Sequence, residues 1–329
     1  MIYLFFCEKE KQSSIAETKF LMNESENKSA LNYFIFDKEY PLHNCMLGVV
    51  CGSTNSGKSY FTYKYILPAY IKNGAVKTVL ICSRTGKYDQ TTSSLLDDEV
   101  YRDCCIDFVK LDETYERCQL IRSNAIINEY IDKFMNVKNE KEIADTLKKL
   151  KNLIKSSSEL NVIHDELSKF YTYVSGFISI DIDAVHEYAR LLWVSGSKIM
   201  YNPTIIVFDD YASTSEFLKP TSNLHKLVYV RRHLHLSVLV LTQSIVAVSA
   251  SIRRNTSLFV LFSTLSEMDL KCIRDRLPIK YSYKELLQKF IEISESDNRD
   301  DKVISIFSFY PFQCVIQGTP PVLKALTKK

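Results

Sequence analysis

The sequence predicts an α/β fold in which a mostly parallel central sheet is flanked by helices and carries a helical insertion. Short apolar runs rich in Val, Ile and Phe recur along the chain, and near-continuous apolar strands are typical of a parallel sheet buried on both faces. Between Leu111 and Thr204 no comparable run occurs, and the sequence there is helix-like. The predicted strands span residues 45–51, 77–83, 104–111, 204–210, 237–243, 257–263 and 303–309.

Helical spacing identifies the insertion. In the segment 140–154, Ile143, Leu147, Leu150 and Ile154 recur every three or four residues, which is the spacing of one apolar helix face. We therefore predict a single domain over residues 33–329 with a helical insertion at about 112–203. The polar segment 1–32 shows no sustained period and is interpreted as a loose N-terminal arm. Further helices are predicted at about 58–67, 184–196, 215–232, 266–276 and 282–294.

Composition limits the classes of protein that need to be considered. The 329 residues are 46% apolar and 25% charged, as in ordinary globular proteins, and no apolar run approaches the roughly 18 residues needed to span a bilayer. The nine cysteines contain no C-x-x-C pair, which favours a reducing compartment. Cys51, Cys82 and Cys314 lie in apolar runs, so we expect buried thiols there. These features predict a cytoplasmic protein without a membrane partner.

A phosphate-binding motif follows the first predicted strand. Residues 52–59, GSTNSGKS, match G-x-x-x-x-G-K-[ST], the pattern of a loop whose backbone N–H groups wrap a triphosphate. Because the chain has only 8 glycines, a chance match is improbable. Lys58 is expected to reach the β- and γ-phosphates and the Ser59 hydroxyl to ligate Mg²⁺. The residues predicted to bind ATP are Gly52, Ser53, Thr54, Asn55, Ser56, Gly57, Lys58 and Ser59.

Two carboxylates end the predicted strand TIIVFDD, residues 204–210. Ligands bind at the carboxyl edge of open α/β sheets, which is where these side chains should lie. Asp209 is expected to hold Mg²⁺ beside Ser59, and Asp210 to orient and deprotonate the attacking water. The alternative is a solvated turn, because aspartate is common in turns.

The third element comprises Gln243 and a basic pair ten residues beyond it. Gln243 closes a predicted strand, where it could bond the γ-phosphate or the attacking water. Arg253 or Arg254 could stabilise transition-state charge in a neighbouring subunit. The alternatives are a solvent-exposed strand end for Gln243 and ordinary surface or structural arginines for the pair. A net charge of +3 provides no bulk attraction to nucleic acid, so DNA binding would require a local basic surface.

The order and spacing of GSTNSGKS, IIVFDD, VRRHLHLSVLVLTQS and SIRRNTSLFVLF resemble the poxvirus-type genome-packaging ATPases of large DNA viruses and virophages, a branch of the FtsK/HerA superfamily. The resemblance spans about 45–265. It implies a RecA-like P-loop core, ring-shaped homo-oligomers and ATP-driven movement of double-stranded DNA into a preformed capsid, with a capsid vertex or portal protein as a candidate partner. It would place the protein in infected-cell cytoplasm, a virus factory or the virion. The family's basic element matches Arg231, Arg232 and His233, and its trans-acting arginine falls on Arg253 or Arg254.

Two other functions remain open at this point. A P-loop kinase for a nucleotide or similar small acceptor could use the insertion as a lid, but kinase lids commonly supply arginines, whereas this insertion is rich in lysines such as Lys148, Lys149 and Lys151. An assembly protein could instead keep ATP as a structural ligand, against which Asp210 argues. Stimulation of hydrolysis by DNA distinguishes the translocase from the kinase, and multiple turnover excludes the structural role.

Overall fold

The computed structural model describes residues 40–83, 90–102, 104–177, 182–196, 203–211, 214–219, 221–263, 266–274, 282–309 and 312–325. The arm predicted for 1–32 lies outside these ranges. The chain divides into two compact units, one from residues up to Leu111 together with Pro203 onwards, and one from Asp112 to Asn202. We call them the core unit and the insertion unit. Whether they form one domain with an insertion stays a prediction.

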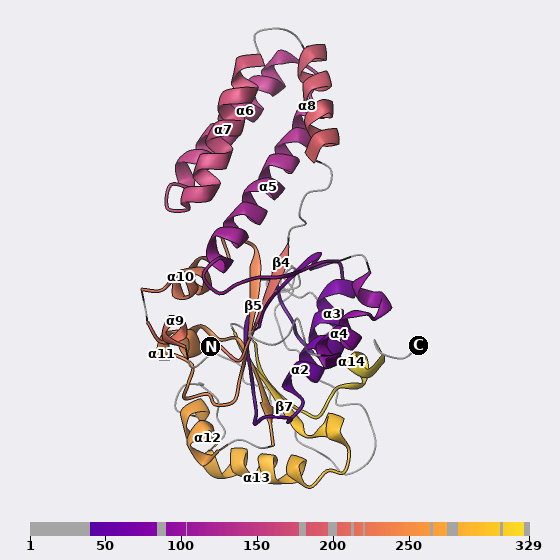
Figure 1. Cartoon of the computed structure of the whole chain (residues 1–329), viewed down its shortest axis with the longest axis vertical. Coiled ribbons are helices and arrows are strands. Elements are labelled where there is room, and N and C mark those ends of the chain that lie inside the picture. Colours follow the sequence, from indigo (N-terminus) through magenta and orange to yellow (C-terminus); the bar gives the residue numbers. More distant parts are fainter. Residues whose placement is uncertain are drawn as a thin grey trace, which may run out of the picture. The chain divides into compact units, whose positions relative to one another are not determined.

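The described residues of the core unit form an eight-stranded sheet in the order β3-β2-β4-β5-β1-β6-β7-β8 (Figure 1). The strands from β3 to β6 in this order pair in parallel, while β6–β7 and β7–β8 pair antiparallel. The sheet is therefore mostly parallel, as predicted. Its strands are β1 (Leu47–Cys51), β2 (Thr78–Ser83), β3 (Cys105–Phe108), β4 (Thr204–Asp209), β5 (Leu236–Thr242), β6 (Leu258–Phe262), β7 (Val303–Phe309) and β8 (Phe312–Gln317).

Helices cover both faces of this sheet (Figure 1). Alternate side chains of a strand point to opposite faces, so Val207 packs in the cluster under the first helical run, whereas the ring of Phe208 meets that of Phe217 at 5.4 Å between centroids. The first run consists of α2 (Lys58–Phe61), a π-helical segment (Thr62–Ile66) and α3 (Leu67–Lys72). The other helices are α4 (Gln90–Leu96), α9 (Ser215–Leu218), α10 (Asn223–Val230), α11 (Ala250–Asn255), α12 (Glu267–Arg274), α13 (Tyr283–Ser294) and α14 (Pro321–Ala325), with short 3-10 turns at Glu99–Tyr101 and Arg299–Asp301.

Two details differ from the predictions. The single helix predicted over 215–232 is wrong: α9 and α10 are separate, and Ser222 caps α10 by accepting a hydrogen bond from the N–H of His225. The segment after β7 forms β8, which the sequence analysis missed. Only two residues separate β7 from β8, and so short a link allows only antiparallel pairing. Cys51 and Cys82 are buried as predicted, and the Cys314 side chain lies outside the described part.

The insertion unit is helical. It contains α5 (Thr114–Met135), α6 (Glu140–Ser156), α7 (Asn161–Phe177) and α8 (Ile182–Gly196), and α5 packs against each of the other three. Leu150 and Leu167 are fully buried between helices. Gln119 on α5 accepts a hydrogen bond from the N–H at the start of α7, at Val162 (3.1 Å). None of the helices in the described ranges is long and apolar enough to cross a membrane.

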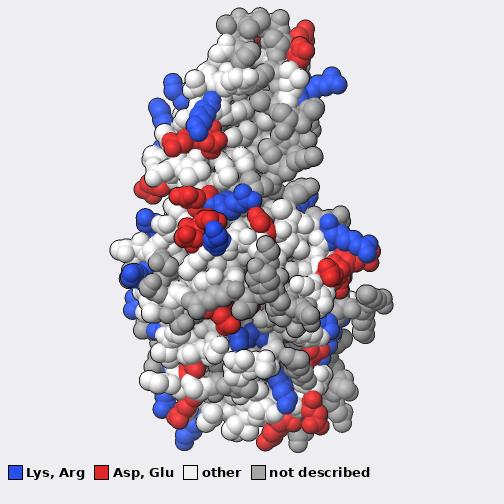
Figure 2. Space-filling view, viewed as in Figure 1, with Lys and Arg blue, Asp and Glu red and all other residues white. Residues whose placement is uncertain are grey.

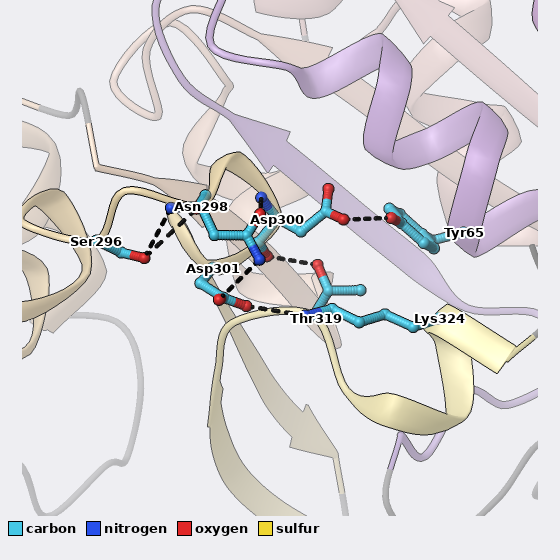
Figure 3. A network of polar contacts seen from close by, with 7 residues as sticks. All are labelled: Tyr65, Ser296, Asn298, Asp300, Asp301, Thr319 and Lys324. Atoms are coloured by element: carbon cyan, nitrogen blue, oxygen red, sulfur yellow. Dashed lines mark hydrogen bonds and ion pairs between the residues drawn. The ribbon is translucent and has the colours of Figure 1, made fainter.

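A polar network anchors the π-helical segment to the far end of the chain (Figure 3). The Tyr65 hydroxyl donates to the Asp300 carboxylate (2.8 Å), and Thr319 donates to the Asp300 carbonyl (2.6 Å). Next to it, Asp301 forms an ion pair with Lys324 of α14 at 3.0 Å. Burial, followed by the hydrogen bond to Asp300, raises the pKa of Tyr65. The network therefore attaches the helix behind the phosphate-binding motif to the β7–β8 end of the sheet.

Candidate nucleotide site

The predicted site residues converge because three parallel strands end at one edge. In the sheet, β5 lies between β4 and β1. The register aligns Asp209 with Leu241 of β5, and Leu241 with Val50 of β1. The next residues along each strand are Asp210, Thr242 and Cys51, and the glycine loop starts directly after Cys51. The carboxyl edge thus assembles the loop, the two carboxylates and Gln243.

The loop between β1 and α2 requires glycine at both motif positions. A Cβ on Gly52 would lie 2.5 Å from the Ser56 hydroxyl oxygen and 2.8 Å from the Cβ of Phe262, so no larger residue fits. Gly57 has a φ of 104°, a conformation that side chains disfavour. Asn55 has a φ of 61°, which asparagine tolerates better than most residues. The backbone conformation of the loop therefore depends on these residue types.

Lys58 is buried against this loop. Its ammonium donates to the carbonyls of Gly52 (2.9 Å) and Ser53 (2.8 Å), and only 8% of the residue is exposed. Burial lowers the pKa of Lys58, while the charges of Asp210 and Asp209 act in the opposite direction. The lysine is held where it can exchange loop carbonyls for phosphate oxygens.

The two predicted Mg²⁺ ligands lie together. The Ser59 hydroxyl donates to the Asp209 carboxylate at 3.4 Å, although the residues are 150 positions apart in the chain. Both side chains are partly buried. A hydroxyl and a carboxylate are hard oxygen donors of the kind that Mg²⁺ prefers, so Ser59 and Asp209 are chemically suited to hold this ion.

Asp210 and Gln243 are exposed at the same edge. Asp210 has a φ of 59°, in the left-handed region that aspartate can adopt, and this turns the chain away from β4. Gln243 is held through its neighbours: the Thr242 hydroxyl donates to the Ser244 carbonyl (2.9 Å) and accepts from its N–H (3.3 Å). The carbonyl of Thr242 also accepts the N–H of Gly52 at 3.2 Å. Gln243 is thus linked to the first residue of the glycine loop.

The two arginines of α11 differ in their surroundings. Arg253 folds back on the preceding loop, where its Nη1 donates to the carbonyls of Ile245 (3.1 Å), Val246 (3.2 Å) and Val248. Arg254 is exposed to solvent. The sequence could not separate the members of this pair, and the contacts do.

Arg231 of the basic element lies at the opposite edge of the sheet, near the start of β1. It is 6% exposed and donates to the carbonyls of Cys45 (3.0 Å), Val228 (2.7 Å) and Asn255 (3.5 Å). Burial, reinforced by the charge of Arg232, lowers the pKa of Arg231 to about 10. Its contacts join three segments of the core unit. Arg232 and His233 are exposed.

Sequence reasoning missed Asp269, a buried carboxylate on α12 that contacts the loop after Gln243. Its only local signal is the pattern Ser266-x-x-Asp269 at a helix start, which predicts a cap and no contact with another loop.

On the face shown in Figure 2, basic and acidic side chains are interspersed over the described surface.

Comparison with known proteins identified one family. Residues 190–311 match the model of the family described as Poxvirus A32 protein, a segment that includes Asp209, Asp210, Gln243 and both arginines of α11. A search of curated proteins found no match.

Several solved structures are similar to this chain at low sequence identity. The genome packaging NTPase B204 of Sulfolobus turreted icosahedral virus 2, in complex with AMP, is 13% identical, with 84% of this chain and 96% of that chain covered and a TM-score of 0.44. B204 of Sulfolobus turreted icosahedral virus, a DNA-packaging ATPase, is 12% identical, with 84% and 98% covered and a TM-score of 0.40. EssC (ATPases 2 and 3) of Geobacillus thermodenitrificans is 11% identical, with 88% and 44% covered and a TM-score of 0.40.

Proposed function

We propose that this chain is an ATP-driven double-stranded DNA translocase of the Poxvirus A32 protein family, whose model matches residues 190–311, and that it packages a viral genome into a preformed capsid. The observation that carries this proposal is the 3.4 Å contact between Ser59 and Asp209. It unites the phosphate-binding motif, which lies outside the matched segment, with the carboxylates inside it. The proposal covers ATP hydrolysis, the Mg²⁺ ion and the DNA partner.

Each side chain at the carboxyl edge has a role in hydrolysis. The N–H groups of residues 52–59 and the Lys58 ammonium bind the phosphates, and Lys58 neutralises charge that develops on them. Asp210, exposed beside this loop, accepts a proton from the attacking water. Gln243 donates or accepts a hydrogen bond that orients the same water.

Ser59 and Asp209 would hold the Mg²⁺ that accompanies ATP. The ion would screen the charge of the β- and γ-phosphates when bound. Asp209 is suited to this because its carboxylate already faces the Ser59 hydroxyl, while Asp210 lies one residue further out. We therefore assign Mg²⁺ binding to Asp209 and acceptance of the proton from water to Asp210.

Arg254 is the better candidate for the arginine supplied to a neighbouring subunit. It is exposed, whereas the guanidinium of Arg253 is committed to loop carbonyls of its own chain. A finger supplied in trans requires an assembly in which each subunit faces the next, so the proposal includes a ring-shaped homo-oligomer. A capsid vertex or portal protein is a further candidate partner, and infected-cell cytoplasm, a virus factory or the virion is the proposed location.

The experiment that tests this function measures ATP hydrolysis by the full-length chain with and without duplex DNA. We expect Mg²⁺-dependent multiple turnover that duplex DNA stimulates, and tracking along duplex DNA in a triplex-displacement assay. Hydrolysis without displacement would reduce the proposal to an ATPase. Phosphate transfer to an added nucleoside monophosphate without DNA stimulation would support the kinase alternative instead.

A further inference from the structure

The loop that follows Gln243 is held by a buried carboxylate from another helix. Asp269 of α12 is 3% exposed. Its Oδ1 accepts from the Ser244 hydroxyl (2.7 Å), the Ile245 N–H (2.7 Å) and the Val246 N–H (3.3 Å). Its Oδ2 accepts from the Ser266 hydroxyl at 2.6 Å. One carboxylate therefore binds three consecutive residues of the loop.

Arg253 holds the same loop by its other polar groups. Asp269 takes N–H groups of Ile245 and Val246, while the Arg253 guanidinium donates to the carbonyls of those two residues. The anion and the cation thus bind opposite ends of the peptide group that joins Ile245 to Val246. Because each side chain uses groups that the other cannot use, the two contacts are complementary.

The charge of Asp269 is essential to this arrangement. Burial alone would raise the pKa of Asp269, but the hydroxyls of Ser266 and Ser244 and the N–H groups of Val246 and Ile245 outweigh burial and lower it. The carboxylate is therefore ionised near neutral pH and acts purely as an acceptor, which matches the donors around it.

The position of Gln243 depends on the same loop. Its backbone lies between Thr242, which pairs with Cys51 of β1 at the end of β5, and Ser244, which Asp269 and Thr242 both bind. The side chain itself is exposed. Thr242 is hydrogen-bonded to Gly52, the first residue of the glycine loop. If Ser244 were not held, the Gln243 backbone would shift relative to that loop.

We propose that Asp269 is a positioning residue for Gln243: by binding Ser244, Ile245 and Val246 it fixes the orientation of Gln243 toward the attacking water. This inference rests on the proposed ATPase function. It assigns α12, which contributes nothing to the phosphate-binding motif, a role in the rate of hydrolysis. It also explains why a carboxylate is buried on α12.

The test compares steady-state ATP hydrolysis and ATP binding of full-length variants. In Asp269→Ala the loop loses its acceptor, and kcat should fall on the order of 10- to 100-fold, the size expected for a misplaced catalytic group. The dissociation constant for an ATP analogue should change by less than about threefold, because Lys58 and the glycine loop are untouched. Asp269→Asn keeps one acceptor oxygen and should give a smaller fall in kcat. It also supplies the comparison if Asp269→Ala does not fold.

A matched control removes a helix cap without touching the loop. Ser282 caps α13 in a capping box with Glu285, and Ser282→Ala should lower thermal stability while leaving kcat within about twofold of the parent value. The decisive readout is the double variant. In a Gln243→Ala background the Asp269 substitution should lower kcat by less than about threefold, because its effect is transmitted through Gln243.

Three results separate the possible outcomes. Parent-like kcat in a folded Asp269→Ala or Asp269→Asn protein overturns the inference. An undiminished effect in the Gln243→Ala background also overturns it, since Asp269 would then act through another group. Absence of ATP hydrolysis in the unsubstituted chain instead overturns the proposed function.

Discussion

Lys58 and Arg231 are both buried cations that lie near opposite ends of strand β1, and both donate to main-chain carbonyls. They differ in what surrounds them. Two carboxylates, Asp209 and Asp210, raise the pKa of Lys58 against the effect of burial. Arg231 has a second cation, Arg232, beside it. Lys58 therefore lies at an edge that suits reversible binding of a charged ligand. Arg231 lies at an edge where its contacts stabilise the fold.

The two cations also differ in how many segments of the chain they join. Arg231 donates to carbonyls before β1, at the end of α10 and at the end of α11, so moving it would open three segments. Within the described part of the chain, Lys58 donates only to carbonyls of the loop that immediately precedes it. Its contacts can be exchanged for those to a ligand without disturbing the sheet. Two features thus mark Lys58 as a functional cation: its hydrogen bonds to the loop can be exchanged for bonds to a ligand, and anions lie near it.

The largest expected effect is on Lys58. Lys58→Ala should reduce ATP hydrolysis below detection, because the ammonium that meets the phosphates is lost, while the thermal melting temperature changes by only a few degrees. Steady-state phosphate release and a thermal melt measure the two quantities. Lys72→Ala, at the end of the same helical run, is the control and should keep the parent rate. Substantial turnover in folded Lys58→Ala would remove the central claim.

The arginines of α11 extend the comparison to a second pair. Arg254→Ala should lower kcat on the order of 10³-fold at unchanged ATP affinity, as expected for a finger acting in trans. Arg253→Ala should instead destabilise the protein, because the carbonyls of Ile245, Val246 and Val248 lose their donor.

Mixing experiments identify the subunit in which Arg254 acts. Arg254→Ala mixed with Lys58→Ala should regain part of the activity, because some interfaces then combine an intact loop with an intact finger. No recovery at any ratio, with mixed assemblies confirmed by mass spectrometry, would mean that Arg254 acts in its own subunit or not at all.

The two aspartates at the end of β4 should separate binding from chemistry. Asp210→Asn should retain Mg-ATP binding but slow cleavage about 10²-fold, the usual effect of losing a general base. Single-turnover kinetics measure the chemical step, and calorimetry measures affinity. Asp209→Asn is the matched variant and should weaken Mg²⁺-dependent binding. Equal loss of binding in both would assign both residues to the metal.

Arg231 provides the converse of Lys58. Arg231→Met should lower the free energy of unfolding by about 2–4 kcal/mol, because buried carbonyls are left without a donor. The kcat of the folded fraction should stay within about threefold of the parent value. Urea unfolding measures the loss, and Arg232→Met, at an exposed position, should cost less than about 0.5 kcal/mol. A large fall in kcat for stable Arg231→Met would contradict the division between the two edges.

The smallest effect concerns His43, which lies near Arg231. His43 bonds the Ser257 hydroxyl at 3.1 Å, and burial, aided by the charges of Arg231 and Arg232, lowers its pKa from 6.5 to about 4. The unfolded chain therefore binds more protons between these values, so stability present above pH 6.5 is lost as the pH falls toward 4. At most this amounts to about 3 kcal/mol.

The pH experiment compares the parent chain with His43→Gln. Urea unfolding between pH 7 and pH 4.5 should show a steeper loss of stability in the parent chain, since glutamine does not titrate. Identical slopes would show that His43 titrates alike in the folded and unfolded chains.

Local patterns in the sequence determined the strands, the phosphate-binding motif and the carboxyl-edge location of Asp209 and Asp210. Strand periodicity, a glycine loop between a strand and a helix, and carboxylates at a strand end are short-range features. They predict the contact between Ser59 and Asp209 because all parallel strands point their carboxyl ends to one edge. The same patterns did not predict the break between α9 and α10, or β8.

Only the tertiary structure decided which charged residues serve the site and which hold the fold. Arg253 and Arg254 are adjacent and identical in type, but only one of them is bonded to the loop after Gln243. Asp269 and Arg231 carry no motif that reveals their partners distant in the chain. The loop partners of Asp269 lie 23 to 25 residues away, and the most distant partner of Arg231 lies 186 residues away; such pairings arise when strands and helices pack. A charge acquires its role from the groups that burial places around it, and burial is a property of the packed chain.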